Sequence, residues 1–205
     1  MKKIGLFFGS FNPVHNGHMI IANYILEFSN LEEIWFVVSP QNPLKNKKSL
    51  LADYHRLALL KEAIYDAPKY KASDIEFKMP KPSYTIDTLT YLKEKYPEKD
   101  FALIMGEDNL QSFKKWKNYE MILKNFELYV YNRPGYDSSE FKNHEKVNFI
   151  DAPLMEISSS FIRKAISEGK NIQFYMPQKS YTYMKEMHFY EDLHYKKDFI
   201  SKLMG

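Results

Sequence analysis

Two histidines in one short stretch, FFGSFNPVHNGHMIIANYIL, have the residue types and spacing of a ligand-binding site. His15 and His18 flank an Asn-Gly pair, between an apolar run and residues that recur at helical spacing. This pattern indicates a strand-to-helix turn. Gly9 would let the backbone approach a ligand closely, and Gly17 suits a tight turn into the helix.

Three interpretations of the histidine pair stand side by side. A helix N-terminus offers unpaired N–H groups and a partial positive charge, which bind phosphate, and the histidines would add two donors aimed at the same anion. A metal site would need further ligands, and the stretch has no cysteine, HExxH sequence or carboxylate-rich triad to supply them. The histidines could also do no more than cap the turn. Neither a P-loop nor a G-x-G-x-x-G pattern occurs.

A second candidate stretch, EISSSFIRKAI, lies far along the chain. Ser158, Ser159 and Ser160 can cap a helix and hold phosphate oxygens together with its N–H groups. Arg163, one turn further, can face the same anion with a bidentate guanidinium. Without the histidine stretch, an ordinary serine cap with a solvated arginine would explain these residues better than a phosphate site. Together with the histidine stretch it favours a shared phosphate site.

The elements that must position these residues alternate between buried strands and amphipathic helices. Strands are predicted at 2–8, 33–38, 101–105, 127–131 and 147–150, with a short one near 70–76. Helices are predicted from 17 on, at about 51–64, 85–96 and 159–167, in a short stretch through Trp116, and over most of the last thirty residues. The alternation predicts an α/β fold, a Rossmann-like doubly wound parallel sheet with a small, mostly helical C-terminal part. Ligands bind beyond the carboxyl ends of such strands, where both candidate stretches fall.

The bulk composition narrows the class of protein. The 205 residues predict a single domain, 1–205, with a core of about 1–176 and a helical tail of about 177–205. There is no cysteine, which excludes disulfides and thiolate metal sites. The net charge is only +3, and no stretch approaches the roughly 18 apolar residues of a membrane span. We therefore expect a cytoplasmic protein that binds neither nucleic acid nor membrane, with an oligomeric state left open between monomer and homodimer.

At this point the motifs resemble a known family. GSFNPVHNGH with a downstream ISSSFIR is similar to the HxGH nucleotidyltransferases. SPQNPLK, PSYTIDTL, LIMGEDNLQSFKKWKNYEMIL and YNRPG resemble, in the same order, bacterial nicotinate-nucleotide adenylyltransferase. The resemblance covers roughly 1–185. Three departures stand out: Asn12 replaces an aspartate, Ser160 replaces a threonine, and the loop Asn42-Pro43-Leu44-Lys45 differs from the usual P-P-H-K type.

The resemblance implies transfer of AMP from ATP to nicotinate mononucleotide, giving deamido-NAD and pyrophosphate. It places His15, His18 and Arg163 in catalysis, with His18 nearest the α-phosphate. Mg²⁺ would arrive with ATP, held by phosphate and water. The residues implied to bind ATP are Gly9, Ser10, Phe11, Gly17, Ile157, Ser158, Ser159 and Ser160. Those implied on the mononucleotide side are Lys45, Thr85, Gly106, Asp108, Trp116 and Arg133.

Several of these assignments have a structural alternative. Thr85 would open a helix whose N–H groups bind the nicotinate carboxylate, or it is only an N-cap. Trp116 would stack on the pyridine ring, or it packs in the core. Asp108 would accept ribose hydroxyls, whereas Arg133 could instead brace its loop. Asp87, near the same helix start, would repel a carboxylate if it pointed inward.

Rival functions are distinguished by particular residues. Pantetheine-phosphate or glycerol-phosphate nucleotidyl transfer uses the same histidine corner, but PSYTIDTL argues against it. A nucleotide-sensing regulator without turnover would be expected to lack one histidine or Arg163, and this chain has all three. A nucleic-acid-binding module is disfavoured by the balance of 29 basic and 26 acidic side chains.

Overall fold

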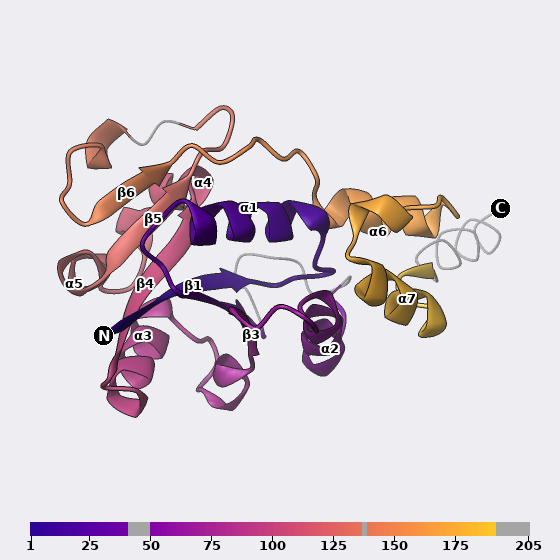
Figure 1. The fold of residues 1–205 in the computed structure, drawn as a ribbon, viewed down its shortest axis with the longest axis horizontal. Coiled ribbons are helices and arrows are strands. Elements are labelled where there is room, and N and C mark those ends of the chain that lie inside the picture. The colour runs from indigo at the N-terminus through magenta and orange to yellow at the C-terminus, as the bar shows by residue number, and fades with distance from the viewer. Residues whose placement is uncertain (41–49, 137–138, 192–205) are drawn as a thin grey trace, which may run out of the picture.

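The computed structural model describes residues 1–40, 50–136 and 139–191 (Figure 1). The predicted loop contact Lys45 and the part of the predicted tail after 191 lie outside the described residues. In the part that is described, no helix has the length and apolar character needed to cross a bilayer.

One parallel sheet forms the centre of the described chain, with strand order β3-β2-β1-β4-β5-β6. The strands are β1 Lys2–Gly9, β2 Glu33–Val38, β3 Tyr70–Ser73, β4 Lys99–Gly106, β5 Glu127–Tyr131 and β6 Val147–Ile150. Phe7 of β1 lies opposite Phe36 of β2 on one side and Ile104 of β4 on the other. The strand order reverses between β1 and β4, and the crevice beyond their carboxyl ends is where such sheets bind ligands. The predicted doubly wound parallel sheet is confirmed.

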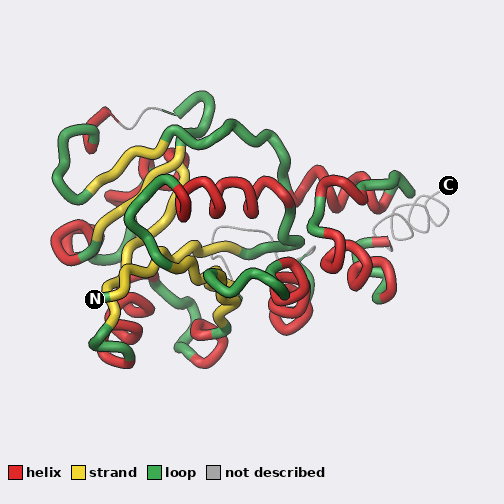
Figure 2. The backbone as a smooth tube through the Cα atoms, in the orientation of Figure 1, coloured by secondary structure: helices red, strands yellow, loops and turns green. Residues whose placement is uncertain are grey.

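Helices cover both faces of this sheet, which explains why the central strands are nearly continuous apolar runs (Figures 1 and 2). On one face lie α1 Asn16–Glu27 and α2 Asp53–Ala63, and α6 Ser159–Ser167 and α7 Gln178–Glu186 contribute side chains to the same core cluster. The layer on the other comprises α3 Thr85–Lys95, α4 Glu107–Gln111 and α5 Tyr119–Asn125. Helices α6 and α7 lie beyond the carboxyl ends of the strands, and α7 packs against α2.

Two elements differ from the prediction. The strand predicted near 70–76 ends at Ser73 and is followed by a 3₁₀ helix, Ile75–Lys78. As an edge strand, β3 pairs only with β2, and its last partner is Val37. The helical stretch through Trp116 is a chain of short pieces: α4, the 3₁₀ helix Phe113–Lys115, and α5 after Asn118 in the left-handed region (φ 51°). An asparagine tolerates that conformation better than most residues.

Candidate active site

The two candidate phosphate-binding stretches are in contact. Arg163, one turn into α6, donates from Nη1 to the backbone carbonyl of Asn12 at 2.7 Å. Ser159 donates from Oγ to the carbonyl of Pro13 at 2.9 Å. The loop after β1 is therefore bonded directly to the N-terminal turn of α6, as the sequence predicts.

The start of α6 is built as a serine cap. Ser158 is the N-cap, and its Oγ accepts a hydrogen bond of 3.1 Å from the N–H of Phe161. Ser160 accepts from Nη2 of Arg163 at 3.2 Å, so the guanidinium is held at both ends. Burial lowers the pKa of Arg163, which remains far above neutral for any arginine. The helix start thus presents a fixed cation and unpaired N–H groups to the same region.

The two histidines form one stacked unit at the start of α1. Their ring centroids lie 3.7 Å apart with an interplanar angle of 27°. The N–H of His15, the N-cap, donates to Nδ1 of His18 at 3.2 Å. Nδ1 of His18 is therefore an acceptor, and the proton of a neutral His18 ring is on Nε2.

His15 is the buried partner of this pair. Its side chain is almost inaccessible, and Nδ1 has no hydrogen-bond partner among the described residues. Burial, and to a smaller extent the nearby Arg133 guanidinium, lowers the pKa of His15 to about 4. His15 is therefore a neutral imidazole at neutral pH and can offer an anion a hydrogen bond but no charge.

Glycines at positions 9 and 17 leave room for aromatic rings. A Cβ on Gly9 would lie 2.8 Å from the ring of Phe11, and one on Gly17 would lie 3.0 Å from Nδ1 of His15. Gly17 is inside the first turn of α1 without a positive φ, so it provides space for the ring and not the tight turn expected from the sequence. Ile157 lies on the other side of Gly17, 3.5 Å from the same Cβ position.

Phe11 packs against the ring of His18. Its backbone is in the left-handed region (φ 43°), and its ring is buried. The ring meets that of His18 edge-on at 5.1 Å. Strained backbone of this kind is concentrated at functional sites, where the surrounding structure holds it in place.

A cavity of about 440 Å³ opens beside the end of β1 and the start of the loop that follows it. Its volume is within the size range of small-molecule sites. It lies between the ends of β1 and β4 on one side and the start of α3 on the other. Four predicted site residues line it: Gly9, Ser10, Thr85 and Trp116. The structure thus brings residues from both predicted halves of the site to one cavity.

The start of α3 supplies N–H groups at this cavity. Thr85 is the first residue of the helix and Tyr84 the N-cap, so Thr85 is not itself the cap. The first N–H groups of a helix have no acceptor within it. Asp87 pairs with Lys117, whose Nζ lies 2.9 Å from Oδ2 and 4.7 Å from the centre of the Tyr84 ring. The carboxylate of Asp87 is therefore compensated by an adjacent ammonium group, which lessens the repulsion considered above.

Trp116 packs in the core and also lines the cavity, and its stacking on the pyridine ring stays a prediction. It packs partly into the core, with its ring edge-on to Phe113 at 5.4 Å. It also lines the cavity opposite β1. A half-buried indole held by core contacts is a preorganised surface for a planar ring.

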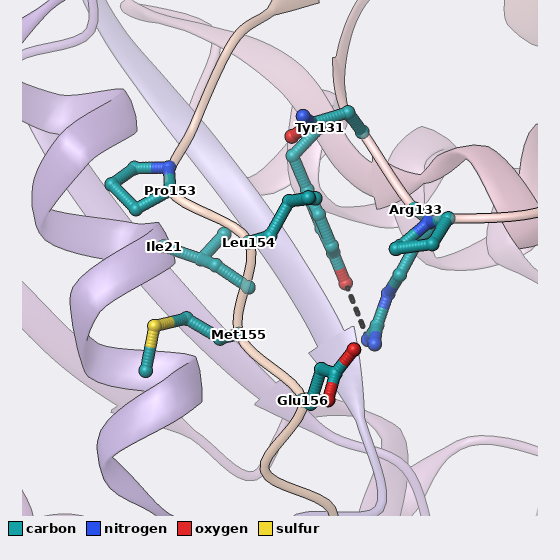
Figure 3. Close-up of a pocket in the computed structure, with 9 residues that line it drawn as sticks. Ile21, Tyr131, Arg133, Pro153, Leu154, Met155 and Glu156 are labelled. Atoms are coloured by element: carbon teal, nitrogen blue, oxygen red, sulfur yellow. Dashed lines mark hydrogen bonds between the residues drawn. The ribbon is translucent and has the colours of Figure 1, made fainter.

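The ends of β4 and β5 carry the other predicted residues, Gly106, Asp108 and Arg133. A Cβ on Gly106 would lie 2.3 Å from Oδ1 of Asp108 and 3.1 Å from the ring of Tyr131, so a side chain here would displace the Asp108 carboxylate. Nε of Arg133 lies 3.7 Å from the same oxygen, and Nη2 lies 3.5 Å from the hydroxyl of Tyr131 (Figure 3). The backbone N–H of Arg133 also donates to Glu107 at 3.0 Å, which holds this loop to the residue after β4.

Buried polar atoms without hydrogen-bond partners concentrate at this end of the sheet. Among the described residues they include Oδ1 of Asp108, Nε of Arg133, Oδ1 of Asn132 and Nδ1 of His15. Buried polar groups in folded proteins have partners as a rule. The crevice of about 10 Å³ beside Arg133 and Glu156 has no room for an organic ligand. The cluster marks a place where polar ligand atoms would be stabilised.

Sequence reasoning missed Arg56 of α2, which is fully buried. Its guanidinium donates to the backbone carbonyls of Ser10, Ser39, Pro40 and Leu51 and pairs with Asp53 at 2.7 Å. It therefore joins the loop after β1 to the segment after β2 and to the start of α2. A single arginine in an amphipathic helix gives no sequence signal that distinguishes this role from solvation.

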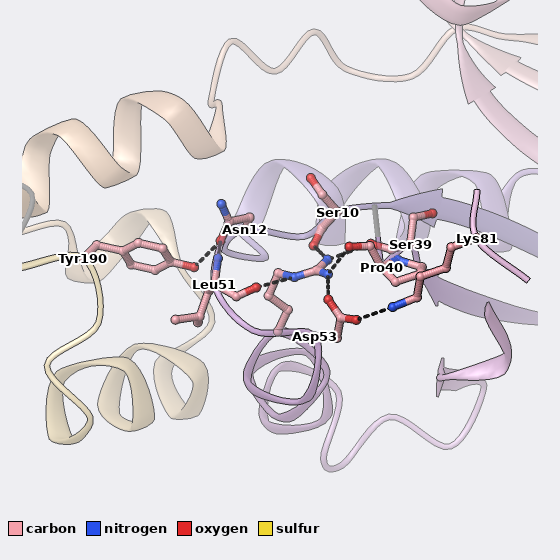
Figure 4. Close-up of polar contacts among 9 residues, drawn as sticks. Ser10, Asn12, Ser39, Pro40, Leu51, Asp53, Lys81 and Tyr190 are labelled. Carbon is pink, nitrogen blue, oxygen red and sulfur yellow. Dashed lines mark hydrogen bonds and ion pairs between the residues drawn. The ribbon is translucent and has the colours of Figure 1, made fainter. Parts of the chain in front are cut away.

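The structure also explains Asn12. Oδ1 of this buried residue accepts from the N–H of Leu51 at 3.1 Å and from the hydroxyl of Tyr190 at 2.8 Å (Figure 4). Both partners are donors, so the position needs an acceptor oxygen, which an amide supplies without burying a charge.

No group of three or more metal-binding side chains occurs within 1–40, 50–136 and 139–191. The arrangement comprises neutral and cationic hydrogen-bond donors at the loop after β1 and the start of α6, and a cavity that the same loop borders with Gly9 and Ser10 and that also contains helix N–H groups and an indole. Such a site can hold a polyphosphate next to a planar anionic ring.

Comparisons with known proteins agree with this geometry. The chain matches the cytidylyltransferase-like family over residues 6–165. Proteins named probable nicotinate-nucleotide adenylyltransferase from Christiangramia forsetii and Flavobacterium johnsoniae are each 54% identical to it, over 93% and 92% of this chain and 99% of their own length. A solved structure of Plasmodium falciparum nicotinic acid mononucleotide adenylyltransferase complexed with NaAD has the same fold, with a TM-score of 0.78 and 24% identity. It covers 93% of this chain, and the match spans 98% of that one.

Proposed function

The chain belongs to the nicotinate-nucleotide adenylyltransferases of the cytidylyltransferase-like family, and we propose that it transfers AMP from ATP to nicotinate mononucleotide with the residues described above. One observation carries the assignment of residues: the N-terminus of α3 and Trp116 share a cavity with Gly9 and Ser10. The contact between α6 and the loop after β1 adjoins the same two residues.

The reaction needs no protein nucleophile. A phosphate oxygen of the mononucleotide attacks the α-phosphorus of ATP, the new P–O bond gives deamido-NAD, and the bond to the β-phosphate breaks to release pyrophosphate. The acceptor is already an anion, so no general base has to remove a proton. The barrier comes from bringing two anions together and from charge that grows on the leaving pyrophosphate, which positioned donors stabilise.

On the ATP side, the donors have distinct roles. Nε2–H of His18 points a hydrogen bond at charge developing on the α-phosphate, and neutral His15 holds the His18 ring by stacking. Ser159, Ser160 and Arg163 bind the β- and γ-phosphates, together with the N–H groups of α6. Mg²⁺ enters as part of the substrate MgATP and supplies charge neutralisation on its phosphates.

On the acceptor side, the N–H groups at the start of α3 bind the nicotinate carboxylate, and Trp116 stacks on the ring. The ammonium of Lys117 neutralises the carboxylate of Asp87 beside this helix start. Asp108 accepts ribose hydroxyls at the end of β4. Lys45 stays a prediction for contact with the mononucleotide or pyrophosphate, because it lies outside the described residues.

Pyrophosphate release measured in parallel with three acceptors tests this function. We expect turnover with ATP and nicotinate mononucleotide, weaker turnover with nicotinamide mononucleotide, and none with phosphopantetheine. Turnover with phosphopantetheine in preference to both mononucleotides would reject the acceptor and keep the adenylyl transfer. No pyrophosphate with any acceptor, from folded protein, would reject the enzyme assignment.

A further inference from the structure

A second buried charged side chain, Glu76, lies outside every motif considered so far. It is in the 3₁₀ helix Ile75–Lys78, is only 3% exposed, and lines the 440 Å³ cavity. A carboxyl group is rarely buried in this way unless hydrogen bonds hold it. Its position therefore calls for a role.

The carboxyl of Glu76 accepts a hydrogen bond from Thr88 and shares the cavity wall with two serines. Thr88 donates from Oγ1 at 2.8 Å, and Ser39 and Ser83 line the same cavity, where their hydroxyls lower the pKa of the carboxyl. Ser39 follows β2, Ser83 precedes α3, and Thr88 lies in the first turn and a half of α3. The carboxyl thus lies where the three segments that form this wall of the cavity meet.

Ser39 is itself hydrogen-bonded to the end of β1, where the loop that leads to the two histidines begins. The N–H of Ser39 donates to the carbonyl of Gly9 at 2.9 Å, and the carbonyl of Ser39 accepts from Arg56 at 2.9 Å. A hydrogen bond therefore joins α3 to Glu76, and Ser39, which lines the cavity together with Glu76, is bonded to the end of β1. Burial raises the pKa of Glu76, which the three hydroxyl groups oppose.

A single bound mononucleotide has to contact both the start of α3 and the end of β1. Its pyridine carboxylate binds at the start of α3, and its phosphate has to meet the α-phosphate near Gly9 and the histidines. The distance between these two places therefore decides whether the bound substrate is aligned for attack. We propose that Glu76 is a positioning residue that fixes the N-terminus of α3 relative to β1 and so determines mononucleotide affinity and acid-over-amide selectivity, an inference that depends on the proposed function.

Steady-state kinetics of Glu76→Ala tests the proposal. Thr88 loses its acceptor and the cavity wall loses a buried side chain, so we expect KM for nicotinate mononucleotide to rise on the order of tenfold or more, with KM for ATP changed by less than about twofold. The selectivity for nicotinate over nicotinamide mononucleotide should fall in the same variant. Glu76→Gln keeps the size and one acceptor oxygen, so it should recover most of the wild-type KM.

Two further variants keep the test decisive. Thr88→Val removes the 2.8 Å hydrogen bond to Glu76, and the longer contacts of the same hydroxyl with Met79 and Tyr84, at nearly constant shape. It should raise KM for the mononucleotide a few-fold and replaces Glu76→Ala if that variant does not fold. Glu127→Ala is the matched control, because Glu127 is a hydrogen-bonded carboxylate paired with Lys3 at the opposite end of the sheet. It should lower stability and leave both KM values unchanged.

Equal rises of both KM values in Glu76→Ala, or a loss of thermal stability with unchanged KM and selectivity, would overturn the positioning role. Those outcomes leave the wild-type reaction intact. Absence of wild-type turnover with nicotinate mononucleotide would instead contradict the proposed function itself.

Discussion

Arg163 donates a hydrogen bond of 2.7 Å to the backbone carbonyl of Asn12, and this contact joins positions 151 residues apart. The same guanidinium donates to Ser160 through Nη2. An arginine has five N–H donors, so these two bonds orient the group and leave donors for a phosphate. The cation is preorganised at the junction between α6 and the loop after β1.

Replacement of Arg163 should therefore affect folding, binding and rate together. In Arg163→Ala we expect kcat/KM for ATP to fall by about 10²-fold or more, and the free energy of unfolding to fall by about 1–2 kcal/mol because the carbonyl of Asn12 loses its donor. Arg163→Lys keeps the positive charge but lacks the planar, bidentate guanidinium group, so it should recover only part of the rate. Pyrophosphate release and urea unfolding measure the two effects. Full activity in Arg163→Ala would remove this residue from the phosphate site.

His18 should act mainly on the chemical step. Its Nε2–H is aimed at charge that develops in the transition state, so His18→Ala should lower kcat by roughly 10²–10³-fold, with a much smaller change in ATP affinity. His18→Gln can place an amide N–H near the position of Nε2, and it should retain more activity than the alanine variant. Near-wild-type kcat in His18→Ala would show that the ring is structural.

The buried His15 should make stability depend on pH. Its pKa falls from an ordinary 6.5 to about 4 on folding, so the unfolded chain takes up the proton first as pH decreases. The contribution of this group is complete above pH 6.5 and is lost as pH falls toward 4. Between pH 7 and pH 5 the loss should be about 2 kcal/mol.

Urea unfolding of wild type and His15→Gln at pH 7 and pH 5 measures that contribution. All other titrating groups are common to both proteins, so the decrease between the two pH values should be smaller in the variant by about 2 kcal/mol. Equal decreases in the two proteins would mean that the imidazole is protonated in the folded state.

Arg56 should be a major source of stability. Arg56→Met leaves four backbone carbonyls without this donor and Asp53 without its buried partner, so we expect a loss of about 3 kcal/mol or more. Lys69→Met is a suitable control, because Lys69 forms an exposed pair with Glu27 at 3.4 Å and its removal should cost less than about 1 kcal/mol. Urea denaturation compares them. Similar small losses in both variants would show that the buried network contributes little.

The acceptor pocket should discriminate acid from amide. A pyridine carboxylate offers only acceptors to the N–H groups of α3, whereas a carboxamide brings donors that would remain unpaired. Each mismatch costs about 1–3 kcal/mol, so kcat/KM should favour nicotinate over nicotinamide mononucleotide by about tenfold or more. Competition kinetics with both acceptors measures the ratio. Equal specificity constants would reject this pocket while leaving the adenylyl transfer in place.

The sequence by itself determined the layers of the fold and the meeting of the two motifs. The strands Glu33–Val38, Glu127–Tyr131 and Val147–Ile150 have the predicted limits, because a buried parallel strand is an apolar run that polar turns interrupt. The serine cap places the start of α6 at Ser159 for an equally local reason. Parallel strands bring their carboxyl ends to one edge, so the predicted contact between the histidine stretch and α6 follows from topology.

Only the tertiary structure decided which charged residues are buried and what they hold. Arg56 and Glu76 each occupy a segment whose pattern is the same whether the side chain is solvated or enclosed. Their roles depend on carbonyls and hydroxyls contributed by distant segments. The neutral state of His15 likewise results from burial beneath a second ring and beside Arg133. Desolvation and long-range hydrogen bonds are properties of the packed chain, and no local spacing encodes them.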